Sequence, residues 1–207
     1  MNIAEQINAV ARRITSSGGH YTLVLEQAYD TPPDDLWNAC TDPERLPRWF
    51  EPITGDLREG GRYKLESSGT EGTVERCRPP SQLDITWEYE GDVSWVRVRI
   101  AAVGEGSRLT LEHSAPEDEY WRTYGPCSGG FGWDESFLAL RLLLEGDERA
   151  APEALQKMLA TPEGSSFMDA SLASWSSAYV EWGAGVEEAR EAARRAGDFY
   201  RNLMDQA

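Results

Sequence analysis

The sequence contains few of the residues that build disulfide frameworks and metal sites. It has three cysteines, Cys40, Cys77 and Cys127, and two histidines, His20 and His113. The cysteines are scattered, and no Cys-x-x-Cys pair is present. A disulfide scaffold needs an even set of cysteines, and a zinc site needs clustered ligands, so the sequence argues against both. We expect a cytoplasmic protein without a metal or cofactor.

The sequence also lacks long apolar runs and an excess of basic residues. No stretch approaches the ~20 apolar residues that cross a bilayer, and residues 1–6 have neither the basic start nor the apolar run of a signal peptide. Acidic residues outnumber basic residues by 36 to 20, giving a formal net charge of -16. Phosphate backbones and anionic lipids repel such a polyanion. We therefore expect no nucleic-acid or membrane partner.

Alternating apolar and polar residues predict a series of strands. In one of them, Leu83, Ile85 and Trp87 share a face and are separated by polar residues. This alternation is typical of antiparallel strands with one buried and one solvated face. Glycine and proline residues between the segments supply turns. Further strands are expected over residues 21–29 and 62–66, around Val74, and over residues 95–100 and 109–113.

Apolar residues three and four positions apart predict helices at both ends of the chain. An N-terminal helix is predicted by Ile3, Ile7, Val10 and Ile14. A long helix is expected from Trp133 to Gly146. A short helix over residues 152–159 follows, and an unbroken apolar stripe from Met168 to Leu203 predicts a further helix or helix pair.

Several short motifs stand in a fixed order along the chain. They are the segment 29–49, which contains Leu36-Trp37-Asn38-Ala39-Cys40, then Gly60-Gly61-Arg62-Tyr63, and Gly132-Trp133. With the order of strands and helices, they resemble the SRPBCC (START-like) superfamily, and within it the branch named after the activator of heat shock protein 90 ATPase homologue. The resemblance implies an α+β helix-grip fold over residues 20–146, a curved antiparallel sheet around a long helix. Residues 1–19 are then an N-terminal helix, and residues 147–207 a C-terminal helical extension.

The resemblance also implies a hydrophobic cavity between the sheet and the long helix. Some members of the superfamily bind lipids or other apolar molecules, some resemble polyketide cyclases, and some sequester toxic natural products. We therefore expect non-catalytic binding of a small hydrophobic or aromatic molecule. Two alternatives stay open: a cyclase- or dehydratase-like enzyme that moves a proton, and an interaction module that forms a homodimer through the C-terminal helix.

The candidate ligand contacts are large side chains at inward positions of the predicted strands and helices. They are Trp37, Trp49, Phe50, Tyr63, Leu65, Ile85, Trp87, Leu111, His113, Trp133 and Phe137. Tyr120, Trp121 and Tyr124 precede the glycine-rich segment 125–132, which we interpret as a lid at the pocket mouth or as an ordinary surface loop. A buried aromatic ring is more often core than ligand contact, but many rings facing one interior favour a pocket.

His113 is the candidate for acid–base chemistry, because it is the histidine at a predicted inward position. The ordinary imidazole pKa of ~6.5 suits proton transfer near neutral pH. No second group at a catalytic spacing accompanies it in the sequence. The alternative is a core histidine that is hydrogen-bonded to the backbone.

Overall fold

In a computed structural model, residues 3–204 form an eight-stranded antiparallel sheet and a set of helices. Neighbouring strands follow the order β1-β2-β8-β7-β6-β5-β4-β3, so the last strand, β8, lies between β2 and β7. The strands are β1 (Ala11–Ser17), β2 (His20–Tyr29), β3 (Ile53–Gly55), β4 (Arg62–Leu65), β5 (Glu71–Arg78), β6 (Gln82–Tyr89), β7 (Asp92–Val103) and β8 (Gly106–Pro116).

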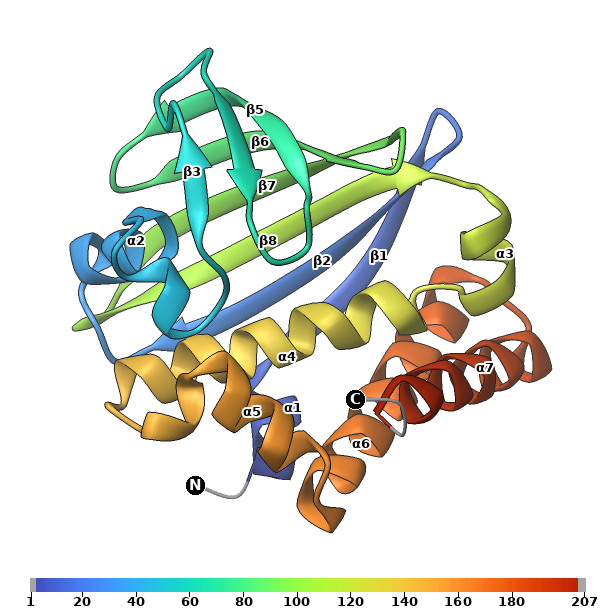
Figure 1. The fold of residues 1–207 in the computed structure, drawn as a ribbon. Helices are drawn as coiled ribbons and strands as arrows, with labels where there is room; N and C mark the ends of the chain where they lie inside the picture. The colour runs from blue at the N-terminus through green and yellow to red at the C-terminus, as the bar shows by residue number, and fades with distance from the viewer. Residues whose placement is uncertain (1–2, 205–207) are drawn as a thin grey trace.

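The longest helix of the predicted domain, α4, runs beneath the sheet, and the C-terminal helices lie on the far side of α4 (Figure 1). The helices are η1 (Ile3–Glu5), α1 (Gln6–Ala9), α2 (Pro33–Thr41), η2 (Leu46–Arg48), α3 (Glu119–Tyr124), α4 (Cys127–Leu144), η3 (Glu148–Ala150), α5 (Pro152–Leu159), α6 (Pro162–Trp182) and α7 (Val186–Met204). The expected α+β helix-grip fold is confirmed. Among residues 3–204, no helix combines the length and apolar character needed to cross a bilayer.

The predicted strand alternation decides which side chains face the interior. On β4, Tyr63 and Leu65 are buried, whereas Arg62 and Lys64 are exposed. Side chains of successive strand residues point to opposite faces, so one face of β4 meets the helices and the other meets water. The alternation fails at a hairpin tip, where Tyr89 at the end of β6 is 50 % exposed, and within β2, where Leu23, Val24 and Leu25 are all buried.

The N-terminal helix predicted for residues 1–19 is wrong beyond residue 9. Residues 11–17 form the edge strand β1, which pairs antiparallel with β2 and places Ile14 opposite Leu23. Val10 already has an extended backbone. The helix-like spacing of the apolar residues is therefore a coincidence, because these residues belong to two different elements. Gly18 and Gly19 both have positive φ. Glycine adopts positive φ at little cost, and two such residues between two strands are a hairpin signal.

The glycine-rich segment 125–132 is neither a lid nor a surface loop, because residues 127–132 are the first turns of α4. A Cβ atom at Gly130 would lie 2.3 Å from Cε2 of the Trp175 indole on α6. Gly125 has a φ of +52°, and a Cβ atom there would lie 2.8 Å from the ring of Tyr179. The glycines therefore allow α6 to pack closely against the start of α4.

A buried ion pair joins β1 to α4. The Nε and Nη2 atoms of Arg12 donate to the carboxylate of Asp134, with the shortest contact at 2.7 Å. The two side chains are 6 % and 1 % exposed. The same carboxylate accepts hydrogen bonds from Ser171 Oγ at 2.6 Å and from Trp175 Nε1 at 3.0 Å, both on α6. Asp134 thus connects three elements that are distant in the sequence.

The C-terminal helices share one hydrophobic core with the sheet and α4. The predicted apolar stripe is a helix pair, because α6 ends at Gly183, which has a φ of +125°. Trp175 on α6 is fully buried. Phe131 of α4 lies 6.1 Å from Phe167 and 4.6 Å from Tyr200 between ring centroids. The predicted boundary at residue 147 therefore falls inside a continuous core.

Replacement of Gly130 tests the close packing of α4 and α6. We expect Gly130→Ala to lower the free energy of unfolding by about 1–3 kcal/mol, because the new methyl group overpacks the Trp175 contact. Gly132→Ala is the matched control: its Cβ atom would lie 3.6 Å from the Tyr200 hydroxyl, an ordinary contact. The control should stay within about 1 kcal/mol of the parent or gain stability from helix propensity. Equal effects of the two changes in urea denaturation would contradict this packing.

Candidate functional site

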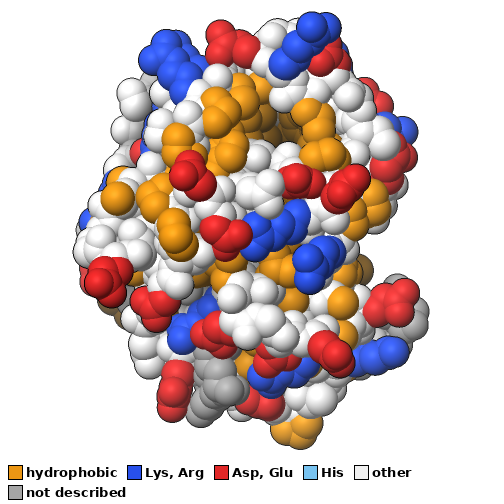
Figure 2. Space-filling model, turned by 90° about the vertical axis from the view of Figure 1, so that its left-hand side faces the viewer, with side chains coloured by type: hydrophobic (Ala, Val, Ile, Leu, Met, Phe, Trp, Pro, Cys, Tyr) orange, Lys and Arg blue, Asp and Glu red, His pale blue; other side chains and the backbone are white. Residues whose placement is uncertain are grey.

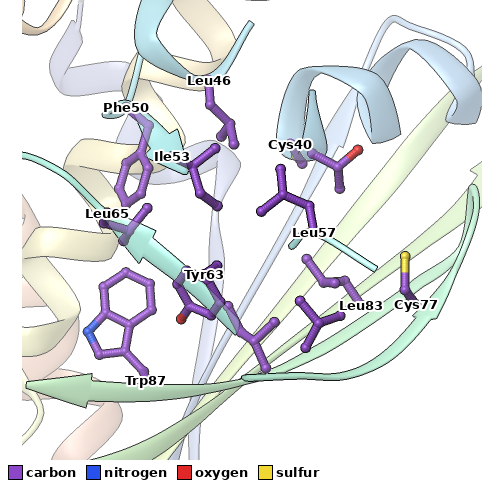
Figure 3. A pocket seen from close by; sticks show the side chains of 13 residues that line it. Cys40, Leu46, Phe50, Ile53, Leu57, Tyr63, Leu65, Cys77, Leu83 and Trp87 are labelled. Carbon is purple, nitrogen blue, oxygen red and sulfur yellow. The ribbon is translucent and has the colours of Figure 1, made fainter. Parts of the chain in front are cut away.

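An apolar cavity with two adjoining chambers lies between the sheet, the α2–η2 segment and α4. The first, here named the β4 chamber, has a volume of about 120 Å³ (Figure 3). Its lining residues are Cys40, Thr41, Leu46, Phe50, Ile53, Leu57, Tyr63, Leu65, Val74, Cys77, Leu83, Ile85 and Trp87. Figure 2 shows a hollow lined by hydrophobic side chains on the face turned to the viewer, with charged side chains around it.

The second chamber, here named the α4 chamber, has a volume of about 100 Å³. Its lining residues are Cys40, Leu46, Trp49, Phe50, Leu83, Ile85, Trp87, Val96, Val98, Leu109, Leu111, Trp133, Ser136, Phe137 and Leu140. The residues that line both chambers are Cys40, Leu46, Phe50, Leu83, Ile85 and Trp87. The two chambers therefore meet along a common wall.

The wall of the β4 chamber depends on a glycine next to a tyrosine. A Cβ atom at Gly72 on β5 would lie 2.6 Å from the ring of Tyr63, so only glycine leaves room for this ring on β4. The Tyr63 hydroxyl donates to the carbonyl oxygen of Thr86 at 2.7 Å. Its polar end is thereby satisfied within the protein, and its ring contributes an apolar surface to the chamber.

Aromatic rings from different elements meet where the two chambers join. Phe50 descends from the segment after η2 toward Trp87 on β6 (Figure 3), and the ring centroids are 6.5 Å apart. Trp49 lies 5.5 Å from Phe50 and is held by a hydrogen bond from its Nε1 to the carbonyl oxygen of Ala39 at 2.9 Å. Trp87 also meets the edge of Trp133 on α4 at 5.7 Å.

His113 stands behind the wall of the α4 chamber and does not line either chamber. Trp133 Nε1, which can only donate, contacts His113 Nδ1 at 3.0 Å. The ring hydrogen is therefore on Nε2, which donates to Ser94 Oγ at 2.9 Å. Burial lowers the pKa of His113 to about 4, so the ring is neutral at pH 7.

The expectation of His113 as a ligand contact or acid–base residue is therefore not supported by its position. Both ring nitrogens are engaged within the protein. The expected core histidine is the better description, although its partners are side chains and not the backbone.

Further predicted contacts lie away from the cavity. Tyr21 stacks on Trp121 at 3.8 Å, and Trp121 meets Tyr179 of α6 at 5.5 Å. Tyr124 lies 5.6 Å from Phe199 of α7. The rings of α3 thus hold this helix against the C-terminal helices.

Two other predicted contacts, Tyr120 and Trp37, also line neither chamber, for different reasons. Tyr120 is 44 % exposed, and its hydroxyl meets that of Ser128. Trp37 is buried in the core but lines neither chamber.

Most of the predicted contacts are nevertheless brought together around the cavity. Those that line a chamber are Trp49, Phe50, Tyr63, Leu65, Ile85, Trp87, Leu111, Trp133 and Phe137. The lining residues that the sequence did not single out are Cys40, Thr41, Leu46, Ile53, Leu57, Val74, Cys77, Leu83, Val96, Val98, Leu109, Ser136 and Leu140. Alternation places Leu83 and Leu109 on inward strand faces beside predicted contacts, whereas nothing in the local pattern places Leu57 there.

No Asp, Glu, Lys or Arg side chain lines either chamber in the described part of the chain. The hydroxyl groups of Thr41 and Ser136 donate to the carbonyl oxygens of Trp37 and Gly132, at 2.8 and 3.0 Å. Burial raises the pKa of the Cys40 thiol to about 12, so it stays protonated and is a poor nucleophile. The cavity is therefore electrically neutral and offers its guest few polar partners.

Comparisons with known proteins give one family. The family model described as Activator of Hsp90 ATPase homolog 1-like protein matches residues 30–145. The solution structure of CalU16 from Micromonospora echinospora is 31 % identical, with a TM-score of 0.60, and the match covers 96 % of this chain and 94 % of that chain. Protein MLL2253 from Mesorhizobium loti is 25 % identical, with a TM-score of 0.54, over 60 % of this chain and 97 % of that chain. A search of curated proteins found no match.

The length of these matches bears on the C-terminal helices. Because the CalU16 match covers 96 % of this chain, it includes α5, α6 and α7. DynU16, from the dynemicin biosynthetic locus, is 21 % identical over 61 % of this chain and 48 % of that chain, with a TM-score of 0.53, and shows the shared fold alone. The helical extension is thus a feature that this chain has in common with CalU16.

The buried neutral His113 predicts a specific pH dependence of stability. The folded ring has a pKa of about 4 and the unfolded ring one near 6.5, so the unfolded chain binds protons more readily between these values. Stability is therefore lost as the pH falls from about 6.5 to about 4, by up to about 3 kcal/mol.

Free energies of unfolding of the parent, His113→Gln and His20→Gln, measured between about pH 7 and pH 4, test this dependence. The His113 variant should lose less stability than the parent over this interval, whereas the His20 variant should follow the parent. Parallel curves for all three proteins would show that His113 does not contribute in this way.

Proposed function

The chain belongs to the family of Activator of Hsp90 ATPase homolog 1-like proteins, within the SRPBCC superfamily, and we propose that it binds a small, uncharged, hydrophobic or aromatic molecule in the two-chambered cavity. Binding without chemical change is the proposed activity.

The neutral lining of the cavity is the observation that carries this proposal. The lining has no ionisable acid or base of ordinary pKa, and the hydroxyl groups of Thr41, Tyr63 and Ser136 already donate within the protein. Moving a charged group from water into such surroundings costs several kcal/mol unless a partner receives it. An apolar guest pays no such penalty and gains from leaving water. The cavity therefore selects against charge.

The same lining favours binding over catalysis. A cyclase-like reaction needs a group that accepts or donates a proton close to the guest. His113 lies behind Trp133 with both ring nitrogens engaged, and the Cys40 thiol is protonated. Nothing among the described lining residues supplies the required acid–base pair.

The C-terminal helices supply little support for the alternative of an interaction module. Met168, Leu172 and Trp175 of the predicted stripe are buried within this chain. Val186 and Leu203 remain exposed, at 57 % and 49 %. A homodimer through α7 therefore stays a secondary proposal, which sedimentation would test.

The chamber volumes indicate the size of the groups that enter. Pockets for drug-sized ligands usually measure ~300–1,000 Å³, whereas an apolar cavity of roughly 150 Å³ holds benzene. Chambers of about 120 and 100 Å³ each correspond to a single aromatic ring or a group of similar size. The favoured guest is therefore built of rings or short branched chains.

Two fluorescent probes with the same rings and different charge test the proposed selectivity. N-phenyl-1-naphthylamine is neutral, and 1-anilinonaphthalene-8-sulfonate adds one negative charge to the same skeleton. We expect the neutral probe to bind at least about tenfold more tightly, because the sulfonate would lose its hydration without gaining a partner. Val186→Asp is the control for binding to exposed apolar side chains and should leave the neutral probe unaffected. Equal affinities, or loss of binding in the control, would reject the cavity as the site.

A further inference from the structure

We propose that the β4 chamber and the α4 chamber are the two halves of one elongated site, which takes an uncharged guest of two or three aromatic rings that passes Phe50 and Trp87. This inference rests on the proposed function and names the guest more closely. It concerns how a guest is distributed between the two chambers of the cavity. Its test is separate from the test of whether the cavity binds a guest.

The two chambers are adjacent, because six residues line both of them. Phe50 and Trp87 line both chambers, and their rings meet at an angle of 55° with centroids 6.5 Å apart. Rings tilted at this distance are in contact with each other, so they leave no slot between them and close the junction of the two chambers. Reorientation of one of the two rings would open the junction and join the chambers.

The two rings differ in how firmly they are held. Trp87 lies on β6, which pairs with β5 on one side and β7 on the other, and its ring abuts Trp133. Phe50 lies on the segment between η2 and β3, outside the regular elements, and is half-buried. Side chains on connecting segments reorient more easily than those fixed in a sheet. Phe50 is therefore the movable side of the passage.

The size of each half sets the length of the guest. Each chamber is somewhat smaller than a cavity that holds one benzene. Each chamber therefore takes at most one ring, whereas a guest of two or three rings needs both. The aromatic side chains on each side, Tyr63 in the β4 chamber and Phe137 in the α4 chamber, provide ring surfaces along the whole length.

Blocking one chamber at a time tests this inference. Leu57 lines only the β4 chamber, and Ser136 lines only the α4 chamber, so Leu57→Phe and Ser136→Phe each fill one half. N-phenyl-1-naphthylamine, with three rings, should lose at least about tenfold in affinity in both variants, because neither remaining half can hold it. Toluene, with one ring, should bind both variants within about threefold of the parent, because one chamber stays open. Fluorescence titration follows the long probe, and calorimetry follows toluene.

The outcomes separate this inference from the proposed function. If neither probe binds the parent protein, the proposed function fails. If the long probe binds the parent but is lost in only one variant, the guest occupies a single chamber and the elongated site is wrong. An unchanged affinity in both variants also rules out the elongated site, because filling either chamber would then not affect the probe. Ile53→Phe and Val98→Phe, which also line one chamber each, replace any variant whose thermal unfolding shows that it is not folded.

Discussion

The position of α4 depends on the buried ion pair between Arg12 and Asp134. The Asp134 carboxylate pairs with the Arg12 guanidinium group on β1 and accepts two further hydrogen bonds from α6. The Asp134 side chain is 1 % exposed. Removing one partner of such a pair leaves an uncompensated buried charge and typically costs about 3–5 kcal/mol. The pair therefore holds α4 from behind, on the side that faces the C-terminal helices, and leaves its opposite side turned to the sheet.

The cavity follows from this arrangement of α4. Trp133 and Phe137 extend from its sheet-facing side and form one wall of the α4 chamber. No residue of α4 lines the β4 chamber, whose cover comes from the segment between α2 and β3 instead. The two chambers thus share walls from β6 and from residues 40–50, whereas α4 covers the α4 chamber alone. Because the rear of α4 is already packed against α6, the helix is not free to move into the sheet and fill the space.

The sequence predicted the parts of this structure that follow from local patterns. Alternation placed Tyr63, Ile85 and Trp87 on inward faces, and the order of motifs indicated the fold. Two of the errors came from contacts between distant segments, whereas the wrong N-terminal helix missed a local hairpin signal at Gly18-Gly19. Gly130 was predicted to lie in a loop. The contact that requires a glycine at this position is with the indole of Trp175, which lies on another helix. The aromatic rings of α3 were predicted to line the cavity, because the sequence did not show where α6 and α7, which cover these rings, pack.

Intermolecular nuclear Overhauser effects between bound N-phenyl-1-naphthylamine and the protein test the central claim, a neutral cavity that admits rings between the sheet and α4. The account predicts contacts from probe protons to the methyl groups of Ile85 and to the ring of Phe137, which line the cavity from the sheet and from α4. Contacts confined to exposed residues such as Val186, with none to these two side chains, would contradict it.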